Sequence, residues 1–293
     1  MRLAHISDLH LRADRPIPLT AWLSQRVLGG LNLWLNRGRE YPEAVAEALW
    51  ADLRRLAPDH LIVSGDLTNL SLPAEFERAR RALGALGLPP AAITVVPGNH
   101  DAYTWGAVRD GDFARVMGDF LHSDLPGAVR GGFPLVHLRG PVAIVALSSA
   151  VWSPPLLATG RLGAAQLAAA EALLDHPELR ARTRIVVVHH PPRSPHVAWH
   201  KRLIDGAALI AMLGRVGADL LLHGHLHRPC ADNLPGPAGQ AVRVIGLTSS
   251  TWLSHDPARR ARYNLLELAA PGEAPRVTSR RFDPAAGAFV ADP

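Results

Sequence analysis

The stretch Gly98-Asn99-His100-Asp101 decides how the rest of the chain is interpreted. It follows Ala92-Ile93-Thr94-Val95-Val96, a β-branched run typical of a buried strand, which Pro97 and Gly98 end. An amide oxygen, an imidazole and a carboxylate therefore stand together at the mouth of a strand. Gly-Asn is also a common turn, so this stretch alone does not indicate a functional site. Four other strands of the chain end in the same way, and together they favour one.

These four other apolar runs also end in side chains that bind metal ions. The runs are residues 2–7, 60–64, 184–188 and 219–223, and the side chains are Asp8, His10, Asp66, His189, His225 and His227. Open α/β sheets hold ligands at the carboxyl ends of their strands. If the five strands share one edge, these side chains converge there with Asn99 and His100. The pairs Asp8/His10 and His225/His227 point to one side wherever strand geometry persists.

The chemistry of these side chains favours a site for two ions. Oxygen and imidazole donors without a thiolate suit Mn²⁺, Fe or Zn²⁺, and disfavour a structural cysteine–zinc site. The seven candidate ligands exceed what one tetrahedral ion needs, and they suit two ions about 3.5–4 Å apart that share a carboxylate. Gly65, Gly98 and Gly224 stand where the backbone must turn close to the site. Taken singly, each motif also reads as a cap, turn or surface histidine, but five together favour the metal site.

The remaining elements predict an α/β fold. Helices are expected at residues 40–56, 73–86, 163–174 and 203–216, and further strands at 135–138, 142–147, 242–247, 262–268 and 276–282. The alternation in the first half implies βαβ units, and the strands at the end suggest a second sheet packed on the first. We therefore predict a sandwich with helices outside, in a single domain of residues 1–293.

Composition narrows the class of protein. With 293 residues and 48% hydrophobic content, the chain is large and apolar enough for a packed core, which excludes a disordered protein. Its single cysteine, Cys230, excludes an internal disulfide and favours a reducing compartment. We expect no signal peptide and no transmembrane helix, and therefore a cytoplasmic location. The net charge of +5 fits an anionic substrate or an anionic surface.

Residues 11–39 form a long, apolar and basic insert after the first pair of candidate ligands. Apolar residues recur at helical spacing, and Gly29-Gly30 interrupts them; they are Leu19, Trp22, Leu23, Val27, Leu31, Trp34 and Leu35. Two interpretations stay open. The insert is a helical segment packed on the core, or residues 19–35 form an amphipathic patch that rests on the inner membrane surface or receives an acyl chain.

The motifs Asp8-x-His10, Gly65-Asp66, Gly98-Asn99-His100-Asp101, His189 and Gly224-His225-x-His227 resemble those of the calcineurin-like metallophosphoesterases in order and spacing. The resemblance covers residues 8–227 and implies a four-layer α-β-β-α sandwich of two mixed sheets flanked by helices. It also implies two metal ions, Mn²⁺ and/or Fe, with Zn²⁺ as an alternative. One ion would be held by Asp8, His10, Asp66 and His227, and the second by Asp66, Asn99, His189 and His225, whereas His190 would lie outside the ligand set.

The resemblance further implies a phosphoester hydrolase. A hydroxide bridging the metals would attack phosphorus in line, while His100 protonates the leaving oxygen and Asp101 orients His100. Asn69, Arg12, Arg193 and Arg228 adjoin the motifs, and we predict them as phosphate contacts.

Four hypotheses on the reaction follow, in order of preference. The Asp-x-His, His189-His190-Pro191-Pro192 and Gly-His-Leu-His forms look like the cyclic-nucleotide (class III) phosphodiesterase branch, which favours a phosphodiesterase of a small phosphoester or nucleotide. The insert at residues 11–39 departs from that branch and suggests instead a membrane-associated pyrophosphohydrolase of a lipid-linked nucleotide such as UDP-diacylglucosamine. A nuclease ranks lower because no basic stripe is interleaved with aromatic residues, so specific nucleic-acid binding is not expected. A non-catalytic, metal-stabilised scaffold ranks last.

Overall fold

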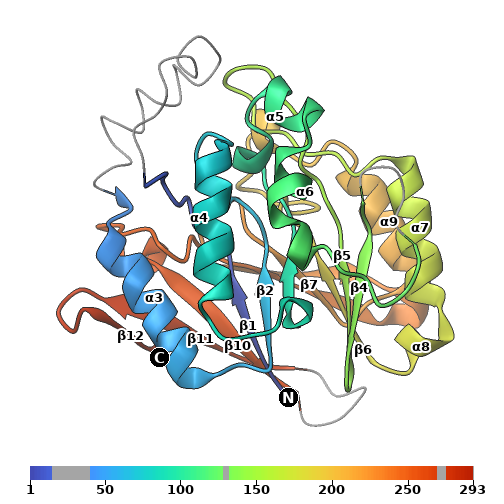
Figure 1. Ribbon diagram of the computed structural model, residues 1–293. Coiled ribbons are helices and arrows are strands. Elements are labelled where there is room, and N and C mark those ends of the chain that lie inside the picture. Colours follow the sequence, from blue (N-terminus) through green and yellow to red (C-terminus); the bar gives the residue numbers. More distant parts are fainter. Residues whose placement is uncertain (15–39, 128–131, 269–274, 293) are drawn as a thin grey trace.

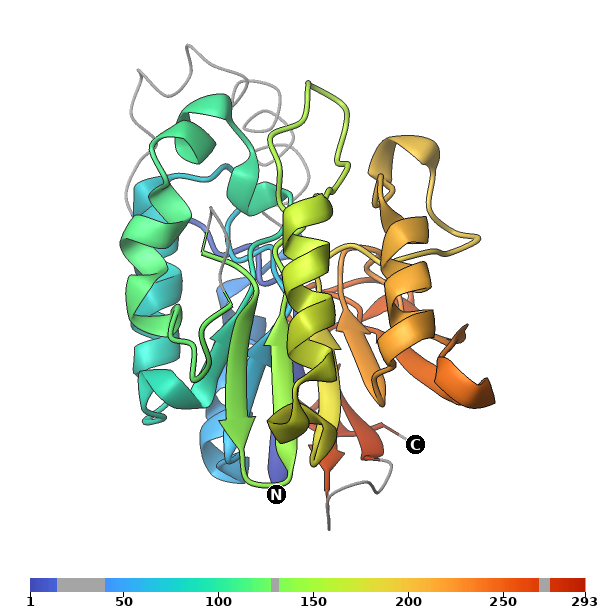
Figure 2. The ribbon, with the colours of Figure 1, turned by 90° about the vertical axis from the view of Figure 1, so that its right-hand side faces the viewer.

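Two six-stranded sheets lie face to face, with helices on their outer faces (Figures 1 and 2). The structure is a computed structural model that describes residues 1–14, 40–127, 132–268 and 275–292. The strand order is β12-β11-β10-β1-β2-β3 in the first sheet and β4-β5-β6-β7-β9-β8 in the second. Both sheets mix parallel and antiparallel pairs, so the predicted sandwich of two mixed sheets flanked by helices is confirmed.

The first sheet is parallel on one side and antiparallel on the other. It consists of β1 (Arg2–Ile6), β2 (His60–Val63), β3 (Ile93–Val95), β10 (Arg262–Glu267), β11 (Arg276–Asp283) and β12 (Ala288–Ala291). Its outer face is covered by α3 (Glu43–Leu56), α4 (Pro73–Gly84) and α6 (Asp112–Met117). α4 begins at Pro73, where the missing N–H costs nothing, and Glu75 closes a capping box with the backbone of Leu72.

The second sheet has a parallel centre and antiparallel edges. Its strands are β4 (Leu135–Arg139), β5 (Val142–Ala146), β6 (Thr183–Val187), β7 (Leu220–His223), β8 (Cys230–Pro235) and β9 (Ala241–Gly246). The helices α7 (Ala164–Asp175) and α9 (Gly206–Val216) pack on its outer face, and α8 (Pro177–Arg180) follows α7. The remaining short elements are α5 (Trp105–Arg109), η3 (Pro90–Ala92), η4 (His100–Ala102), η5 (Gly118–Phe120), η6 (Trp199–Lys201), η7 (Pro237–Gly239) and η8 (Pro257–Arg259).

The layer between the sheets is apolar with a polar bridge. Leu3, Ile62 and Val187 belong to its buried cluster, and the same strands bury their other faces under helices, which explains why most of their residues are apolar. The bridge joins the sheets through buried side chains, because the Thr94 hydroxyl in β3 contacts His60 in β2 at 2.8 Å and also His137 in β4.

The strands at the end of the chain differ from the prediction. They do not build the second sheet alone, since β9 joins that sheet whereas β10 and β11 extend the first sheet beside β1. β8 and β12 were not predicted. The predicted amphipathic patch at residues 19–35 lies outside the described residues. No helix in the described ranges is long and apolar enough to cross a membrane.

Candidate metal centre

Five loops meet at one end of the sandwich, where the parallel strands of both sheets have their carboxyl ends (Figure 1). β1, β2 and β3 supply three of these loops, and β6 and β7 supply the other two from the facing sheet. The expectation that the five strands share the edge of one sheet is therefore wrong, because their loops converge from two sheets. Backbone bonds keep the first two loops paired beyond their strands: Asp8 N–H donates to Gly65 O at 2.9 Å, and His10 N–H to Asp66 O at 3.0 Å.

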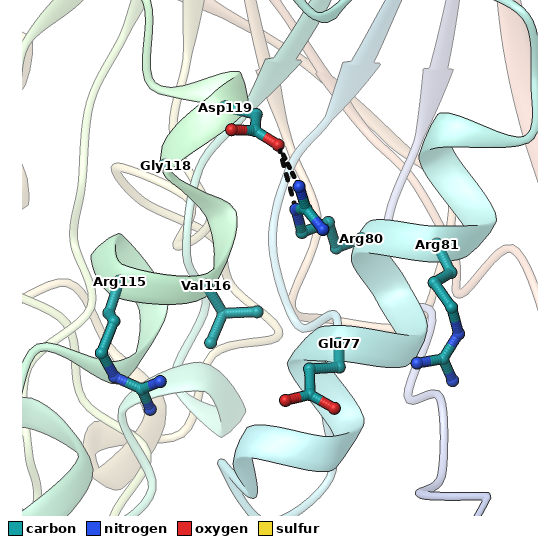
Figure 3. A pocket seen from close by; sticks show the side chains of 7 residues that line it. All are labelled: Glu77, Arg80, Arg81, Arg115, Val116, Gly118 and Asp119. Atoms are coloured by element: carbon teal, nitrogen blue, oxygen red, sulfur yellow. Dashed lines mark hydrogen bonds and ion pairs between the residues drawn. The ribbon is translucent and has the colours of Figure 1, made fainter.

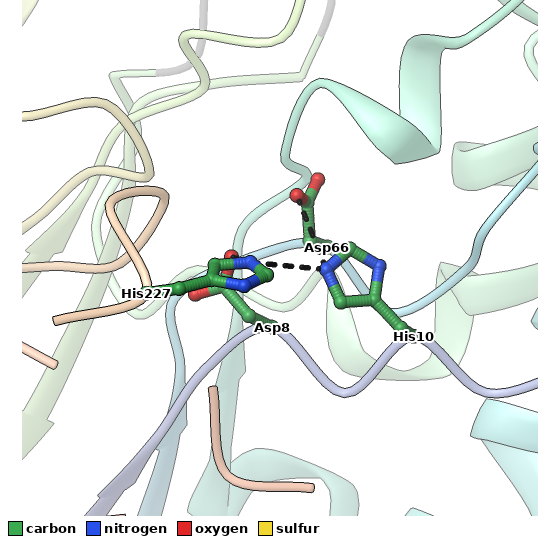
Figure 4. Close-up of side chains that lie close together, drawn as sticks. All are labelled: Asp8, His10, Asp66 and His227. Carbon is green, nitrogen blue, oxygen red and sulfur yellow. Dashed lines mark hydrogen bonds and ion pairs between the residues drawn. The ribbon is translucent and has the colours of Figure 1, made fainter. Parts of the chain in front are cut away.

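The first group of side chains contains Asp8, His10, Asp66 and His227 (Figure 4). One ligand atom of each lies within 4.8 Å of the others. The Nε2 atom of His227 is 3.1 Å from Asp8 Oδ1 and 3.2 Å from His10 Nε2. Asp8, His10 and Asp66 are almost completely buried. The four residues that the sequence assigns to one ion are thus brought together.

Hydrogen-bond acceptors accumulate in this group. His10 donates its Nδ1 proton to the carbonyl of Thr68 at 3.2 Å, so its neutral ring directs the lone pair of Nε2 inward. This nitrogen lies 3.9 Å from Asp66 Oδ2, and His227 Nε2, 3.2 Å from His10 Nε2 and 3.1 Å from Asp8 Oδ1, carries at most one proton. A cation satisfies such a donor set, and the residues present therefore fit a metal ion.

A second group lies beside the first and shares Asp66 with it. Its members are Asp66, Asn99, His189 and His225. Asn99 Oδ1 lies 3.2 Å from His189 Nε2 and 2.9 Å from His225 Nδ1, and Asp66 Oδ2 lies 3.4 Å from His189 Nε2. The far nitrogens of the two rings donate to the carbonyls of Ser64 (2.7 Å) and Lys201 (2.8 Å). Lone pairs therefore converge here as well, which fits a second cation.

The pKa shifts report the same concentration of negative charge. Burial alone would raise the pKa values of Asp8 and Asp66, but the imidazoles of His227 and His189 hold them below their usual range. Burial would lower the pKa of His189, but the carboxylates of Asp66 and Asp8 raise it to about 9. The site thus favours positive charge at its centre.

The backbone at the candidate ligands is left-handed. Five of the nine non-glycine residues with positive φ in the described ranges are candidate ligands, namely Asp8 (53°), His10 (44°), Asp66 (54°), His225 (69°) and His227 (48°). The assumption that strand geometry persists through the two i,i+2 pairs is therefore wrong. Asp and His tolerate this conformation better than most residues, yet each instance costs about 1–3 kcal/mol. The surrounding bonds hold this strained geometry in place.

Gly224 is required by close packing against β1. A Cβ atom on it would lie 3.0 Å from Ser7 Cβ and would overlap the side-chain oxygens of Ser7 and Asp8. These two oxygens are hydrogen-bonded to each other, because the Ser7 hydroxyl donates to Asp8 Oδ2 at 2.6 Å. The backbone N–H of His225 also donates to Asp8, at 3.1 Å. The glycine thereby lets the loop after β7 reach the loop after β1.

His100 lies next to the first group without joining it. It donates its Nδ1 proton to the carbonyl of Asn69 at 2.7 Å, which leaves Nε2 as the unprotonated nitrogen of the neutral ring. Its ring stands edge-on to His10, with 4.8 Å between the centroids, and stacks on Tyr103 at 5.7 Å. His100 is half-buried and therefore open to solvent on one side.

The prediction that Asp101 orients the His100 ring is wrong, because the Asp101 carboxylate is bonded elsewhere. Its carboxylate accepts backbone N–H bonds from Gly98 (2.9 Å), Leu67 (3.1 Å) and Thr68 (3.0 Å), and a bond from the Thr68 hydroxyl (2.9 Å). Burial and the nearby Asp66 raise the pKa of Asp101 to about 7. The carboxylate instead fastens the loop of Asn99 and His100 to the loop of Asp66.

The four predicted phosphate contacts have different surroundings. Asn69 is buried, and its amide donates to the carbonyls of His10 (2.6 Å) and Leu11 (3.3 Å), so it shapes the loop instead. Arg193 is exposed and pairs with Asp232 of β8 at 2.9 Å. Arg12 and Arg228 are half-buried, with no ion pair among the described residues.

Several neighbours of the site carry no sequence signal, because distant segments bring them there. The Tyr41 hydroxyl lies 3.3 Å from His227 Nδ1, and the Trp252 ring lies 5.7 Å from the His227 ring. Arg259 stacks on Trp252 at 4.8 Å. His190 lies outside both groups, as expected, and donates to the Ala158 carbonyl at 3.2 Å.

An open groove of about 440 Å³ lies apart from the metal centre, between α4 and the segment of α6 and η5 (Figure 3). Three arginines line it, but each is already paired with a carboxylate. Arg80 bonds Asp119 at 3.0 Å, Arg115 bonds Asp112 at 2.5 Å, and Arg81 bonds Asp14. The groove therefore presents no free positive charge to an anionic ligand.

Comparison with known proteins agrees with the fold. The chain is 35% identical over 101 residues to glycerophosphodiester phosphodiesterase GpdQ of Enterobacter lignolyticus, which covers 34% of this chain and 30% of that protein. It is 33% identical over 101 residues to a probable cyclic nucleotide phosphodiesterase of Synechococcus sp. This alignment covers 34% of this chain and 31% of that protein. The similarity thus spans about a third of the length of these relatives.

Solved structures share the whole architecture at low identity. A dimetal phosphatase from Danio rerio has a TM-score of 0.57 at 15% identity, over 95% of this chain and 94% of that one. A purple acid phosphatase from yellow lupin seeds has a TM-score of 0.62 at 12% identity. The match covers 99% of this chain and 52% of that one. These likenesses concern the fold alone. The model of the calcineurin-like phosphoesterases matches residues 1–229, and the chain belongs to this family.

Proposed function

We propose that this protein hydrolyses phosphodiesters with the help of two bound metal ions. The observation that carries the proposal is the pair of acceptor clusters that share the buried carboxylate of Asp66. One ion is assigned to Asp8, His10, Asp66 and His227, and the other to Asp66, Asn99, His189 and His225. Oxygen and imidazole ligands suit Mn²⁺, Fe or Zn²⁺. The named activities of the two relatives support a diester as the substrate.

Bound ions of this kind supply Lewis acidity at the phosphoryl oxygens and a water of lowered pKa. The chain's own residues prepare the site for them. The Nδ1 atoms of His10 and His189 are held by the carbonyls of Thr68 and Ser64, so the Nε2 atoms of both rings face the proposed ion sites. Arg12 and Arg228, whose guanidinium groups lack an ion pair among the described residues, are assigned to substrate phosphate.

His100 is assigned as the general acid. Its bond to the Asn69 carbonyl and its stacking on Tyr103 hold the ring beside the first ion site, and Nε2 is the nitrogen assigned to carry the transferred proton. Protonation of the leaving oxygen by a positioned side chain contributes about 10²–10⁴-fold. Asp101 acts indirectly, by holding the loop that carries His100.

The roles of His100 and Asp66 can be separated by experiment. We expect His100→Ala to keep both metals while kcat for bis-p-nitrophenyl phosphate falls about 10²-fold or more. Asp66→Ala should lose metal and activity together, because both ion sites lose their shared ligand. Metal content by mass spectrometry and turnover with added Mn²⁺ provide the two readouts.

The exposed residue His255 provides the matched control, and His255→Ala should behave as wild type. Wild-type turnover in His100→Ala would remove that residue from the mechanism. Full metal content in Asp66→Ala would contradict a shared ligand. Parallel assays with a monoester, a cyclic nucleotide and a linear diester then define the substrate class.

A further inference from the structure

The large hydrophobic side chains that are exposed in the described ranges are all found in three segments at one end of the molecule. The segments are α5, residues 152–156 and residues 199–204, and the side chains are Trp105, Val108, Trp152, Leu156, Trp199 and Ile204. We call this set the apolar rim. Leu156 is 88% exposed, Trp199 69% and Trp105 60%. A group of protruding apolar side chains of this kind is typical of a surface that contacts a partner.

The three segments form one continuous surface. The rings of Trp105 and Trp152 meet edge-on, with 6.1 Å between their centroids. Residues 199–204 are bonded to the chain just after residues 152–156. Ala158 N–H donates to the carbonyl of His200 (2.8 Å), and Ile204 N–H donates to the carbonyl of Gly160 (2.9 Å). Figures 1 and 2 show all three segments at the end where the loops of the metal centre lie.

The apolar rim is attached directly to the metal centre. His225, an assigned metal ligand, donates to the carbonyl of Lys201 within the third segment. His190 donates to the carbonyl of Ala158, just after the second segment. Tyr103, which stacks on His100, lies two residues before Trp105. The rim therefore borders the entrance to the site.

The unpaired charge around the second and third segments of the apolar rim is positive, whereas Arg109 of α5 is paired with Asp110. Residues 148–162 and 189–204 contain no aspartate or glutamate. Arg161, Lys201 and Arg202 are exposed there and have no ion pair among the described residues. Tryptophans, protruding aliphatic side chains and unpaired cations are the features with which proteins bind anionic lipid surfaces. A second copy of the chain fits less well, because like charges would face each other across the contact.

We propose that the apolar rim docks the protein on an anionic lipid surface, with the metal centre facing the headgroups. A phosphodiester presented at that surface would then reach the site without leaving the interface. The docking stands on the rim alone, whereas this consequence for the substrate rests on the proposed function.

Co-sedimentation with vesicles tests the docking. The wild-type protein should pellet with vesicles of phosphatidylcholine and phosphatidylglycerol, and much less with phosphatidylcholine alone. The double variant Leu156→Ser/Trp199→Ser should lower the partition coefficient about tenfold or more, because it removes two side chains that would enter the interface. Arg202→Glu should weaken binding to the anionic vesicles, and added salt should do the same for wild type.

Arg276→Glu is the matched charge control, because Arg276 is exposed at the start of β11, at the opposite end of the sandwich. Hydrolysis of bis-p-nitrophenyl phosphate in solution should be unchanged in all these variants, which shows that they are folded. Vesicle binding without hydrolysis would contradict the proposed function and leave the docking intact.

Three results would overturn the docking proposal. The wild type could stay in the supernatant with anionic vesicles, or the serine double variant could pellet as well as wild type. Gel filtration could also show a dimer that the double variant converts to a monomer, which would make the rim a contact between two copies of this chain.

Discussion

Gly98 leaves no room for a side chain beside the carboxylate that both proposed ion sites share. A Cβ atom there would lie 2.5 Å from the Asp66 backbone nitrogen and 2.8 Å from Asp66 Cγ, closer than real Cβ contacts. We expect Gly98→Ala to displace Asp66 and to reduce bound metal to a minor fraction, measured by mass spectrometry on purified protein.

Gly84, at the end of α4, gives the control because a Cβ on it meets nothing within 4 Å. Gly84→Ala should keep full metal content and raise the free energy of unfolding by about 0.5–1 kcal/mol. A fully loaded Gly98→Ala protein would show that the loop yields without disturbing Asp66.

Residue identity predicts which side chains gather, but not how the backbone presents them. Asp8, Asp66 and His225 were recognised because carboxylates and imidazoles follow apolar runs. Their left-handed conformations are imposed by bonds between loops, such as Asp8 N–H to Gly65 O, which no local pattern encodes. Asp101 shows the same limit, because it adjoins His100 in sequence yet bonds to backbone amides instead.

Among the elements, α3 is anchored to the first sheet by one buried carboxylate. Asp52 accepts bonds from the Tyr263 hydroxyl of β10 (2.6 Å) and from Arg280 of β11 (2.5 Å). Despite burial, the hydrogen bonds of Arg280 and Tyr263 hold the pKa of Asp52 below its usual value. We expect Asp52→Ala to lower the free energy of unfolding, measured in urea, by about 3–5 kcal/mol. The substitution leaves the half-buried guanidinium of Arg280 without its carboxylate partner.

An exposed ion pair provides the comparison. Asp175 pairs with Arg180, and both side chains are more than half exposed. Asp175→Ala should therefore cost no more than about 1 kcal/mol. Equal losses in the two variants would refute the anchoring role of Asp52.

The predictability of the strands follows their burial. β2 and β6 are clear in the sequence because each contains three consecutive apolar residues that are fully buried, Leu-Ile-Val in β2 and Ile-Val-Val in β6. β8, Cys-Ala-Asp-Asn-Leu-Pro, and β12, Ala-Phe-Val-Ala, are edge strands, and each buries only one residue. β10 joins the first sheet by pairing with β1, at the other end of the chain, whereas β9 joins the second sheet by pairing with β7.

For the molecule as a whole, the polar bridge between the sheets predicts acid sensitivity. Burial lowers the pKa of His60 to about 3 and that of His137 to about 4, whereas unfolded histidine titrates near 6.5. The folded state thus binds fewer protons, so its stability is full above pH 6.5 and falls as the pH drops toward 4. Each histidine should remove about 2 kcal/mol of unfolding free energy between pH 7.5 and pH 5.

Urea unfolding of wild type and His60→Gln at both pH values measures this effect. The variant should show a pH dependence smaller by about 2 kcal/mol. His255→Gln, at an exposed position, should keep the wild-type dependence. An unchanged dependence in His60→Gln would mean that this histidine is not kept neutral by folding.

The assigned ligands descend from both sheets, and this has a consequence for the interior. Asp8 and Asp66 follow strands of one sheet and His189 and His225 follow strands of the other, so each proposed ion site draws its ligands from both sides of the layer between the sheets. Ile62 and Val187 belong to the buried cluster that fills this layer. A change in the volume of these interior side chains should therefore shift the proposed ligands of one sheet relative to those of the other.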